Sequence, residues 1–353
     1  MHFAVKQKMN YSTVSHSLKN NPMVPLDFKS LHTIPDSHEW NKSIVVDDPN
    51  TIEPIPIIDL TDPNAVSLIK QACEKWGLML IINHGVPMNI VKELELQTYE
   101  LFSLPSERKA CAHRSEGSLF GYGVHRVAPF FPKLLWSEGF TMLGSPLEHA
   151  AKLWPHQPDQ QTNFCTVMEE YQKEMKKLSG KMMELMLESL GLDSDDVEWF
   201  KPKMGIDRAQ CMLQLNSYPT CPDPDRAMGL APHTDSSILT ILHQSSSGGL
   251  QIHEDGIGWI PVNAVPGSLV VNVGDFMDIL SNGKYKSLYH RAVVNNTHHR
   301  ISVAFFYVPP SDVKNEPLKK LIDDDNPPIY SPVTWAEYLQ KKSYLDVKPK
   351  QGT

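Results

Sequence analysis

The chain has 353 residues, of which 41% are hydrophobic and 21% are charged, a composition typical of a globular protein with a sizeable core. Its 33 basic and 41 acidic residues give a net charge of −8, so nucleic acid is not expected as a partner, because phosphate binding needs a basic surface. No stretch is apolar over the ~18 residues that a membrane-spanning helix needs. The five cysteines form no CxxC pair, which favours a reduced, cytosolic protein over a disulfide framework.

The first half of the chain predicts mainly helices. Residues 1–50 show no sustained periodicity, and we expect an irregular N-terminal arm. Residues 51–207 form the next predicted region. Its expected elements are an edge strand over 55–60, a helix over 62–76, a buried strand over 78–83, a helix over 87–104, functional loops over 112–160 and a long amphipathic helix over 163–191.

The second half of the chain, residues 208–345, has the pattern of a β-sandwich or barrel. Short β-branched or alternating runs follow one another at about ten-residue spacing, separated by turn residues. We predict strands over 209–218, 238–243, 250–253, 259–262, 268–273, 289–294 and 301–308, followed by a covering helix over 333–344. The predicted fold class is therefore α+β with a mainly β core.

Three residues of this half are candidate ligands of one metal ion. His233-Thr234-Asp235 places an imidazole and a carboxylate two residues apart, and side chains at that spacing leave a strand on the same face. His290 stands at the start of a later predicted strand, where a barrel would bring it opposite His233. Two His and one carboxylate leave open positions on an octahedral Fe(II), the ligand set of non-haem oxygenases.

A second pair of residues indicates an anchor for a carboxylate. Arg300-Ile301-Ser302 offers a planar guanidinium fork and, two residues later, a hydroxyl donor. Another His-x-Asp motif, His253 to Asp255, runs into hairpin-turn sequence, so we interpret it as a chance occurrence whose Asp lies in the turn and not beside its His. The site is interpreted as a metal ion together with a binding position for a chelating dicarboxylate.

These motifs resemble the signature of the plant-type Fe(II)/2-oxoglutarate-dependent dioxygenases. The segments Asn83-His84-Gly85-Val86 and Asn216-Ser217-Tyr218-Pro219 resemble further elements of that family. The resemblance covers most of the chain and implies a double-stranded β-helix, or distorted jelly roll, packed by N-terminal helices. It also implies Fe(II) as cofactor, 2-oxoglutarate and O2 as co-substrates, and ascorbate as reductant.

The resemblance carries residue roles with it. It implies that His233, Asp235 and His290 hold the iron and act in catalysis through it, and that His84 is structural. The residues implied in 2-oxoglutarate binding are Arg300, Ser302, Tyr218 and Asn216.

Longer runs resemble the gibberellin 3-oxidases in particular. They include Ile34–Trp40, Gly121–Gly123, Trp136–Thr141 and Leu153–Pro155. The implied reaction is 3β-hydroxylation of an inactive gibberellin precursor to bioactive hormone, coupled to decarboxylation of 2-oxoglutarate to succinate. A rigid apolar diterpenoid with a carboxylate needs an aromatic wall and a cation or strong donor. We expect Tyr122, Arg126 and Phe130 to supply these contacts.

Several alternatives stay open at this point. The hydroxyl could be added at carbon 2, or at both positions, since Pro232, Met277 and Val308 depart from the family pattern near the site. Another apolar substrate, such as a flavonoid, or a hormone-binding module without turnover would use the same fold. A metallohydrolase that cleaves amides or esters uses three protein ligands to zinc plus a base, and the Arg300–Ser302 pair has no role in it. No coiled-coil heptad is present, so we expect a monomer.

Overall fold

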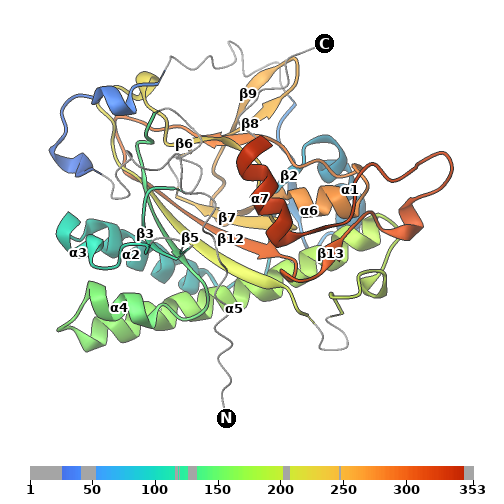
Figure 1. Ribbon diagram of the computed structural model, residues 1–353, viewed down its shortest axis with the longest axis horizontal. Helices are drawn as coiled ribbons and strands as arrows, with labels where there is room; N and C mark the ends of the chain where they lie inside the picture. Colours follow the sequence, from blue (N-terminus) through green and yellow to red (C-terminus); the bar gives the residue numbers. More distant parts are fainter. Residues whose placement is uncertain are drawn as a thin grey trace.

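The computed structural model describes residues 26–40, 53–115, 118, 120–125, 133–201, 207–245 and 248–345. Within these residues two main sheets form the β core (Figure 1). The larger sheet has the strand order β1 (Ile57–Asp59), β2 (Leu78–Ile82), β10 (Leu269–Val273), β7 (Leu239–Gln244), β12 (Arg300–Val308), β5 (Gln210–Tyr218), β4 (Glu138–Met142), β3 (Gly121–Gly123). The smaller sheet has the order β6 (Leu230–His233), β11 (His290–Ala292), β8 (Leu250–Glu254), β9 (Gly258–Val262).

The two sheets enclose a cavity, because residues of both line the same space. The alternation of side chains along β5 shows how: Leu213 and Leu215 belong to the hydrophobic core, whereas Gln214 and Asn216 line the cavity. In β12, Val303 and its alternate neighbours pack in the core in the same way. This arrangement confirms the predicted α+β fold with its double-stranded β-helix core.

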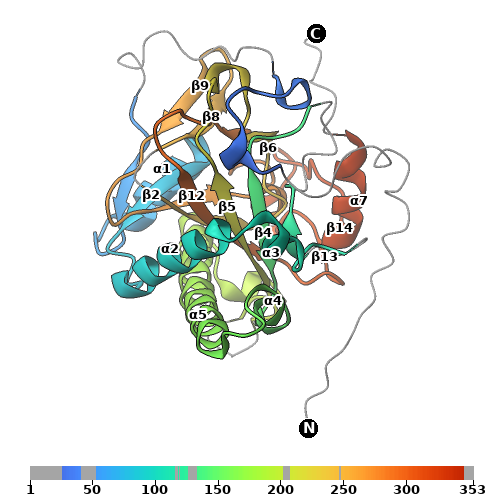
Figure 2. The ribbon, with the colours of Figure 1, turned by 90° about the vertical axis from the view of Figure 1, so that its left-hand side faces the viewer.

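Helices cover the outer face of the larger sheet. The long helix α5 (Pro158–Ser189) runs beneath β5, β7 and β12 (Figure 1). It packs against α1 (Ala65–Lys75), α2 (Met88–Ser103) and α4 (Leu147–Leu153); Figure 2 shows α2, α4 and α5 on one side of the strands. Its apolar face, which includes several methionines, is buried in the core, as expected for the predicted amphipathic helix, and Pro158 occupies the first turn, where a missing N–H costs nothing.

The expectation of loops over residues 112–160 is wrong in part, because β3, β4 and α4 lie there. Every residue of β4 is buried, so this strand shows no alternation of polar and apolar residues from which it could be predicted. Two other helices are short and were also not predicted, α3 (Ser106–Ala110) and α6 (Asp275–Leu280).

The remaining elements are small. The predicted C-terminal helix is α7 (Trp335–Leu345), and β13 (Lys314–Asn315) pairs with β14 (Val333–Thr334). Short 3₁₀ turns cover Phe28–Ser30, Asp36–His38, Ser194–Asp196, Pro224–Arg226 and Lys319–Leu321. None of the helices described here is long and apolar enough to cross a membrane. The division of the chain at residues 207 and 208 stays a prediction.

Candidate metal centre and co-substrate cavity

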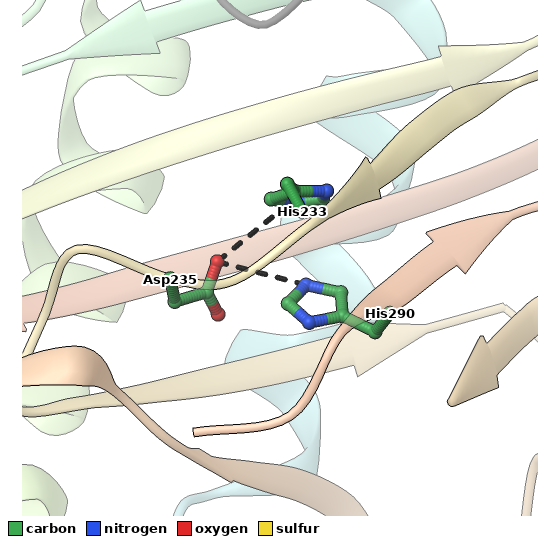
Figure 3. Close-up of side chains that lie close together, drawn as sticks. All are labelled: His233, Asp235 and His290. Atoms are coloured by element: carbon green, nitrogen blue, oxygen red, sulfur yellow. Dashed lines mark ion pairs between the residues drawn. The ribbon is translucent and has the colours of Figure 1, made fainter. Parts of the chain in front are cut away.

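His233, Asp235 and His290 all line the cavity, and their side chains lie close together (Figure 3). The Nε2 atom of His233 lies 3.7 Å from Oδ1 of Asp235, and Nε2 of His290 lies 3.6 Å from the same oxygen. One possible ligand atom from each residue lies within 4.8 Å of the others. The pairing of β6 with β11 is responsible, because it places His290 directly opposite His233.

Asp235 does not lie on the strand that carries His233, contrary to the sequence expectation. Strand β6 ends at His233, and Asp235 belongs to the loop that follows. The loop is held by the backbone N–H of Asp275, which donates to the carbonyl of Asp235 at 2.9 Å. Asn272 Nδ2 donates to Oδ2 of Asp235 at 3.4 Å. The other carboxylate oxygen, Oδ1, therefore stays directed at the two imidazoles.

The imidazole rings are oriented by backbone carbonyls. Nδ1 of His233 donates to the carbonyl of Ala231 at 2.8 Å, and Nδ1 of His290 donates to the carbonyl of Leu288 at 3.3 Å. Each Nε2 then carries its lone pair toward Asp235, which is the arrangement that metal ligation by histidine requires. Burial, followed by repulsion from His290, lowers the pKa of His233, so its ring is in the neutral form that binds metals. The three residues fit a divalent iron ion.

Arg300 supplies a buried cation with unused donors. It is 2% exposed at the start of β12, and its guanidinium carbon lies 4.8 Å from the ring centre of Tyr218. One nitrogen, Nη2, donates to Gln244 Oε1 at 3.3 Å, whereas Nε and Nη1 have no hydrogen-bond partner among the described residues. Each unsatisfied buried donor costs about 1–3 kcal/mol. A carboxylate in the cavity would satisfy both.

The other residues expected at the co-substrate lie around this guanidinium. The register of β5 with β12 places Tyr218 opposite Arg300 and Asn216 opposite Ser302. Asn216 Nδ2 donates to Ser302 Oγ at 3.3 Å. All four residues line the same cavity as the candidate metal ligands. The arrangement therefore fits a dicarboxylate that reaches from the metal to Arg300.

Comparison with known proteins agrees with this chemistry. Residues 209–309 match the 2OG-Fe(II) oxygenase superfamily, and residues 55–162 match the non-haem dioxygenase N-terminal region described from morphine synthesis. The chain is 50% identical over 323 residues to gibberellin 3-beta-dioxygenase 1 of Arabidopsis thaliana, covering 90% of this chain and 89% of that one.

The chain belongs to the 2OG-Fe(II) oxygenase superfamily. It therefore uses Fe(II) and 2-oxoglutarate. A second relative, gibberellin 3-beta-dioxygenase 1 of Pisum sativum, is 48% identical and covers 90% of this chain and 86% of its own length. Among solved structures, JOX2 in complex with 2OG, Fe and JA superposes with a TM-score of 0.73 at 34% identity, covering 88% of this chain and 90% of that one.

One cavity residue of the oxygenase was not identified from the sequence. His125 Nε2 donates to Asn216 Oδ1 at 2.8 Å, and its ring stacks on Tyr218 at 6.2 Å between centres. Burial lowers the pKa of His125 to about 4, so the ring is neutral near pH 7. It follows a short glycine-rich strand and belongs to no motif, so the sequence contains no local signal for its role.

The rest of the cavity is mainly apolar and is shared between the sheets and α7. Thr141 and Gln214 add a polar patch to it. Its larger apolar side chains are Met212, Leu230, Leu242, Leu250, Phe306, Val308, Trp335 and Leu339.

The residues expected at the substrate are placed differently or lie outside the description. Tyr122 is 1% exposed and packs in the hydrophobic core, and it is not among the cavity-lining residues. Its hydroxyl donates to Glu138 Oε2 at 2.5 Å, and Lys109 Nζ donates to the same oxygen at 2.6 Å. Tyr122 thus braces a buried ion pair. Arg126 and Phe130 lie outside the described residues.

Two other histidines were assigned roles from the sequence, and the structure supports one assignment and contradicts part of the other. His84 contacts the backbone, with Nδ1 accepting from Val86 at 3.1 Å, which fits a structural role. Asp255 lies in the turn between β8 and β9 as expected, but its carboxylate is 3.6 Å from His253 Nδ1. The expectation that the turn separates the two side chains is therefore wrong. No third ligand joins them among the described residues.

Proposed function

We propose that this oxygenase adds the 3β-hydroxyl group of a gibberellin and so converts an inactive precursor into bioactive hormone. The observation that carries this proposal is the identity of 45–50% to gibberellin 3-beta-dioxygenases of two species over about nine-tenths of the chain. In the same turnover 2-oxoglutarate is decarboxylated to succinate, with O2 as the oxidant and ascorbate keeping the iron reduced.

The site residues have separate tasks in this proposal. His233, Asp235 and His290 hold Fe(II), which when bound supplies oxygen activation. Arg300 binds the distal carboxylate of 2-oxoglutarate through its two unused donors. Ser302 adds a hydroxyl beside that carboxylate.

Two further residues shape the same pocket. Asn216 and Tyr218 hold Ser302 and Arg300 in place from the neighbouring strand. With all donors prearranged, the co-substrate enters a site that needs little reorganisation on binding.

The apolar part of the cavity suits the rigid hydrocarbon body of a diterpenoid. Its polar patch offers a fixed donor for an oxygen substituent. Arg114 Nη2 donates to Thr141 Oγ1 at 3.2 Å, and Thr141 in turn donates to Gln214 Oε1. Gln214 Nε2 uses one hydrogen on the carbonyl of Leu215 at 2.9 Å. Its second hydrogen is the substrate contact that we propose in place of Tyr122.

Mass spectrometry of the products tests the proposal. Purified protein is incubated with Fe(II), ascorbate, 2-oxoglutarate and a gibberellin that lacks the 3-hydroxyl. We expect a 3β-hydroxylated product and one succinate per hydroxylation, and no product from the His233→Ala variant. A product hydroxylated only at carbon 2 would contradict the proposed position. Unchanged gibberellin with continued succinate formation would contradict the proposed substrate.

We further propose that the enzyme works in the cytosol as a monomer. All five cysteines are free thiols, which suits a reducing compartment. Light scattering on the purified protein should give a mass near the 39.9 kDa of one chain. A mass of two chains or more at working concentration would contradict this.

A further inference from the structure

A lysine of α7 hydrogen-bonds the chain between the candidate ligands His233 and Asp235. Lys342 Nζ donates to the carbonyl of Thr234 at 2.8 Å, to Thr234 Oγ1 at 2.7 Å and to Asp275 Oδ2 at 2.5 Å. Thr234 is the residue between His233 and Asp235. An ammonium group has three N–H donors, and these three acceptors use all of them.

Two neighbouring bonds complete the attachment of this loop. Trp335 Nε1, also on α7, donates to the carbonyl of Ser236 at 2.7 Å. The backbone N–H of Asp275, at the start of α6, donates to the carbonyl of Asp235. Figure 1 shows α6 and α7 side by side, and the ring of Tyr338 packs on Phe276 at 5.2 Å. The loop lies beyond the end of β6 and has no strand-to-strand hydrogen bonds of its own within the described part of the chain, so these contacts hold it in place instead.

The charge of Lys342 does not itself favour a bound cation. The side chains of Lys342 and Asp275 are 15% and 9% exposed, so an unpaired ammonium here would repel a nearby divalent ion with little screening by water. The Asp275 carboxylate neutralises it. The benefit of Lys342 to the metal site is therefore geometric, because it fixes the backbone and hydroxyl of Thr234.

We propose that Lys342 is a positioning residue that holds His233 and Asp235 in the geometry needed to bind one metal ion. It acts through Thr234 and does not touch the metal or the substrates. Because α7 also supplies Trp335 and Leu339 to the cavity wall, the same helix both lines the cavity and positions the ligand loop.

The test compares metal affinity in Lys342→Met with that in Lys341→Met. Methionine keeps an apolar stem and removes the three donors, and Lys341 is an exposed residue of the same helix. Anaerobic equilibrium titration with Fe(II), and with Mn(II) as a redox-stable probe, gives the dissociation constants. We expect Lys342→Met to weaken binding by about 10- to 100-fold, the range for removing a residue that supports metal ligands. Lys341→Met should bind as the unaltered protein does.

Thermal unfolding of the metal-free variants separates positioning from a purely structural role. If Lys342→Met melts at a lower temperature but binds Fe(II) as before, the proposal is overturned. Lys342→Arg keeps a cation that can donate to both partners and should recover part of the affinity.

A milder variant covers the case in which Lys342→Met does not fold. Thr234→Val removes only the hydroxyl acceptor and keeps the side-chain shape, and we expect it to weaken metal binding as well. Unchanged affinity in Thr234→Val would refute the proposal. None of these titrations contains a gibberellin, so their outcome is independent of the substrate assignment.

Discussion

Arg300→Met is the substitution for which the structure predicts two opposite effects. Methionine removes the guanidinium and keeps most of the apolar stem. In the native cavity, Nε and Nη1 of Arg300 are buried without a hydrogen-bond partner in any residue that the structure describes, so both can donate to a carboxylate that binds there. Charge-assisted hydrogen bonds contribute about 1.5–3 kcal/mol each, so two of them contribute about 3–6 kcal/mol to binding of 2-oxoglutarate. This corresponds to roughly 10²- to 10⁴-fold in affinity.

The stability of the ligand-free protein should move the other way or not at all. Burial lowers the pKa of Arg300, which means that the charged form is disfavoured where it lies. Removing a buried cation that has two unused donors and no counterion among the described residues relieves that cost. We therefore expect the melting temperature of ligand-free Arg300→Met to equal or exceed that of the unaltered protein.

Calorimetric titration with two ligands isolates the interaction. 2-Oxoglutarate has the distal carboxylate, and 2-oxopentanoate has the same chain length without it. Arg300→Met should lose affinity for the first and keep its affinity for the second. If the variant binds 2-oxoglutarate within threefold of the unaltered protein, or loses both ligands equally, the reasoning from the unused donors is refuted.

Three further predictions follow from single contacts. His125→Gln should lose less stability on acidification than the unaltered protein. The native pKa of His125, about 4, lies below the unfolded value of 6.5, so the unaltered protein loses about 3 kcal/mol of stability as the pH drops from 6.5 to 4. Denaturant unfolding at both pH values measures the losses, and equal losses in the two proteins would contradict this prediction. Gln214→Leu should raise KM for the gibberellin about tenfold, because it removes the free energy of one hydrogen bond. KM for 2-oxoglutarate should not change, and a rise in both KM values would contradict a specific contact with the gibberellin. Glu138→Gln leaves the buried Lys109 ammonium without its counterion and should cost about 3–5 kcal/mol of unfolding free energy. Glu39→Gln removes one partner of an exposed pair and should cost much less, because water screens such pairs. Equal costs would contradict the burial argument.

Local pattern was sufficient for the long helix and the long strands. The apolar face of α5 could be predicted because burial on one face leaves a period in the sequence. Strand β12 is buried on nearly every residue, and it could be predicted because it is a long run rich in β-branched and aromatic residues. The candidate metal and co-substrate residues could be proposed for a similar reason. His233 and Asp235 are two residues apart, and so are Arg300 and Ser302. At that spacing two side chains can act on one ligand, so each pair could be recognised in the sequence.

The pairing between strands could not be predicted from local sequence patterns. That Arg300 faces Tyr218, and that His290 faces His233, depends on the register of β12 with β5 and of β11 with β6. The sequence placed Tyr218 near Arg300 only through resemblance to a family, and it placed His290 opposite His233 only by assuming that the predicted strands close into a barrel. Strand β4 was missed because burial on both faces removes its alternation.

The sequence by itself determined the class of the fold and the residues proposed as metal ligands and as an anchor for a dicarboxylate, because these depend on residue type and close spacing. Only the tertiary structure showed that His125 joins the co-substrate pocket, that Tyr122 braces Glu138 instead of facing the cavity, and that Lys342 holds the ligand loop. Each of these contacts joins residues of different elements, the last across 108 positions of the chain. Such contacts are selected by packing of the whole fold, and no local period records them.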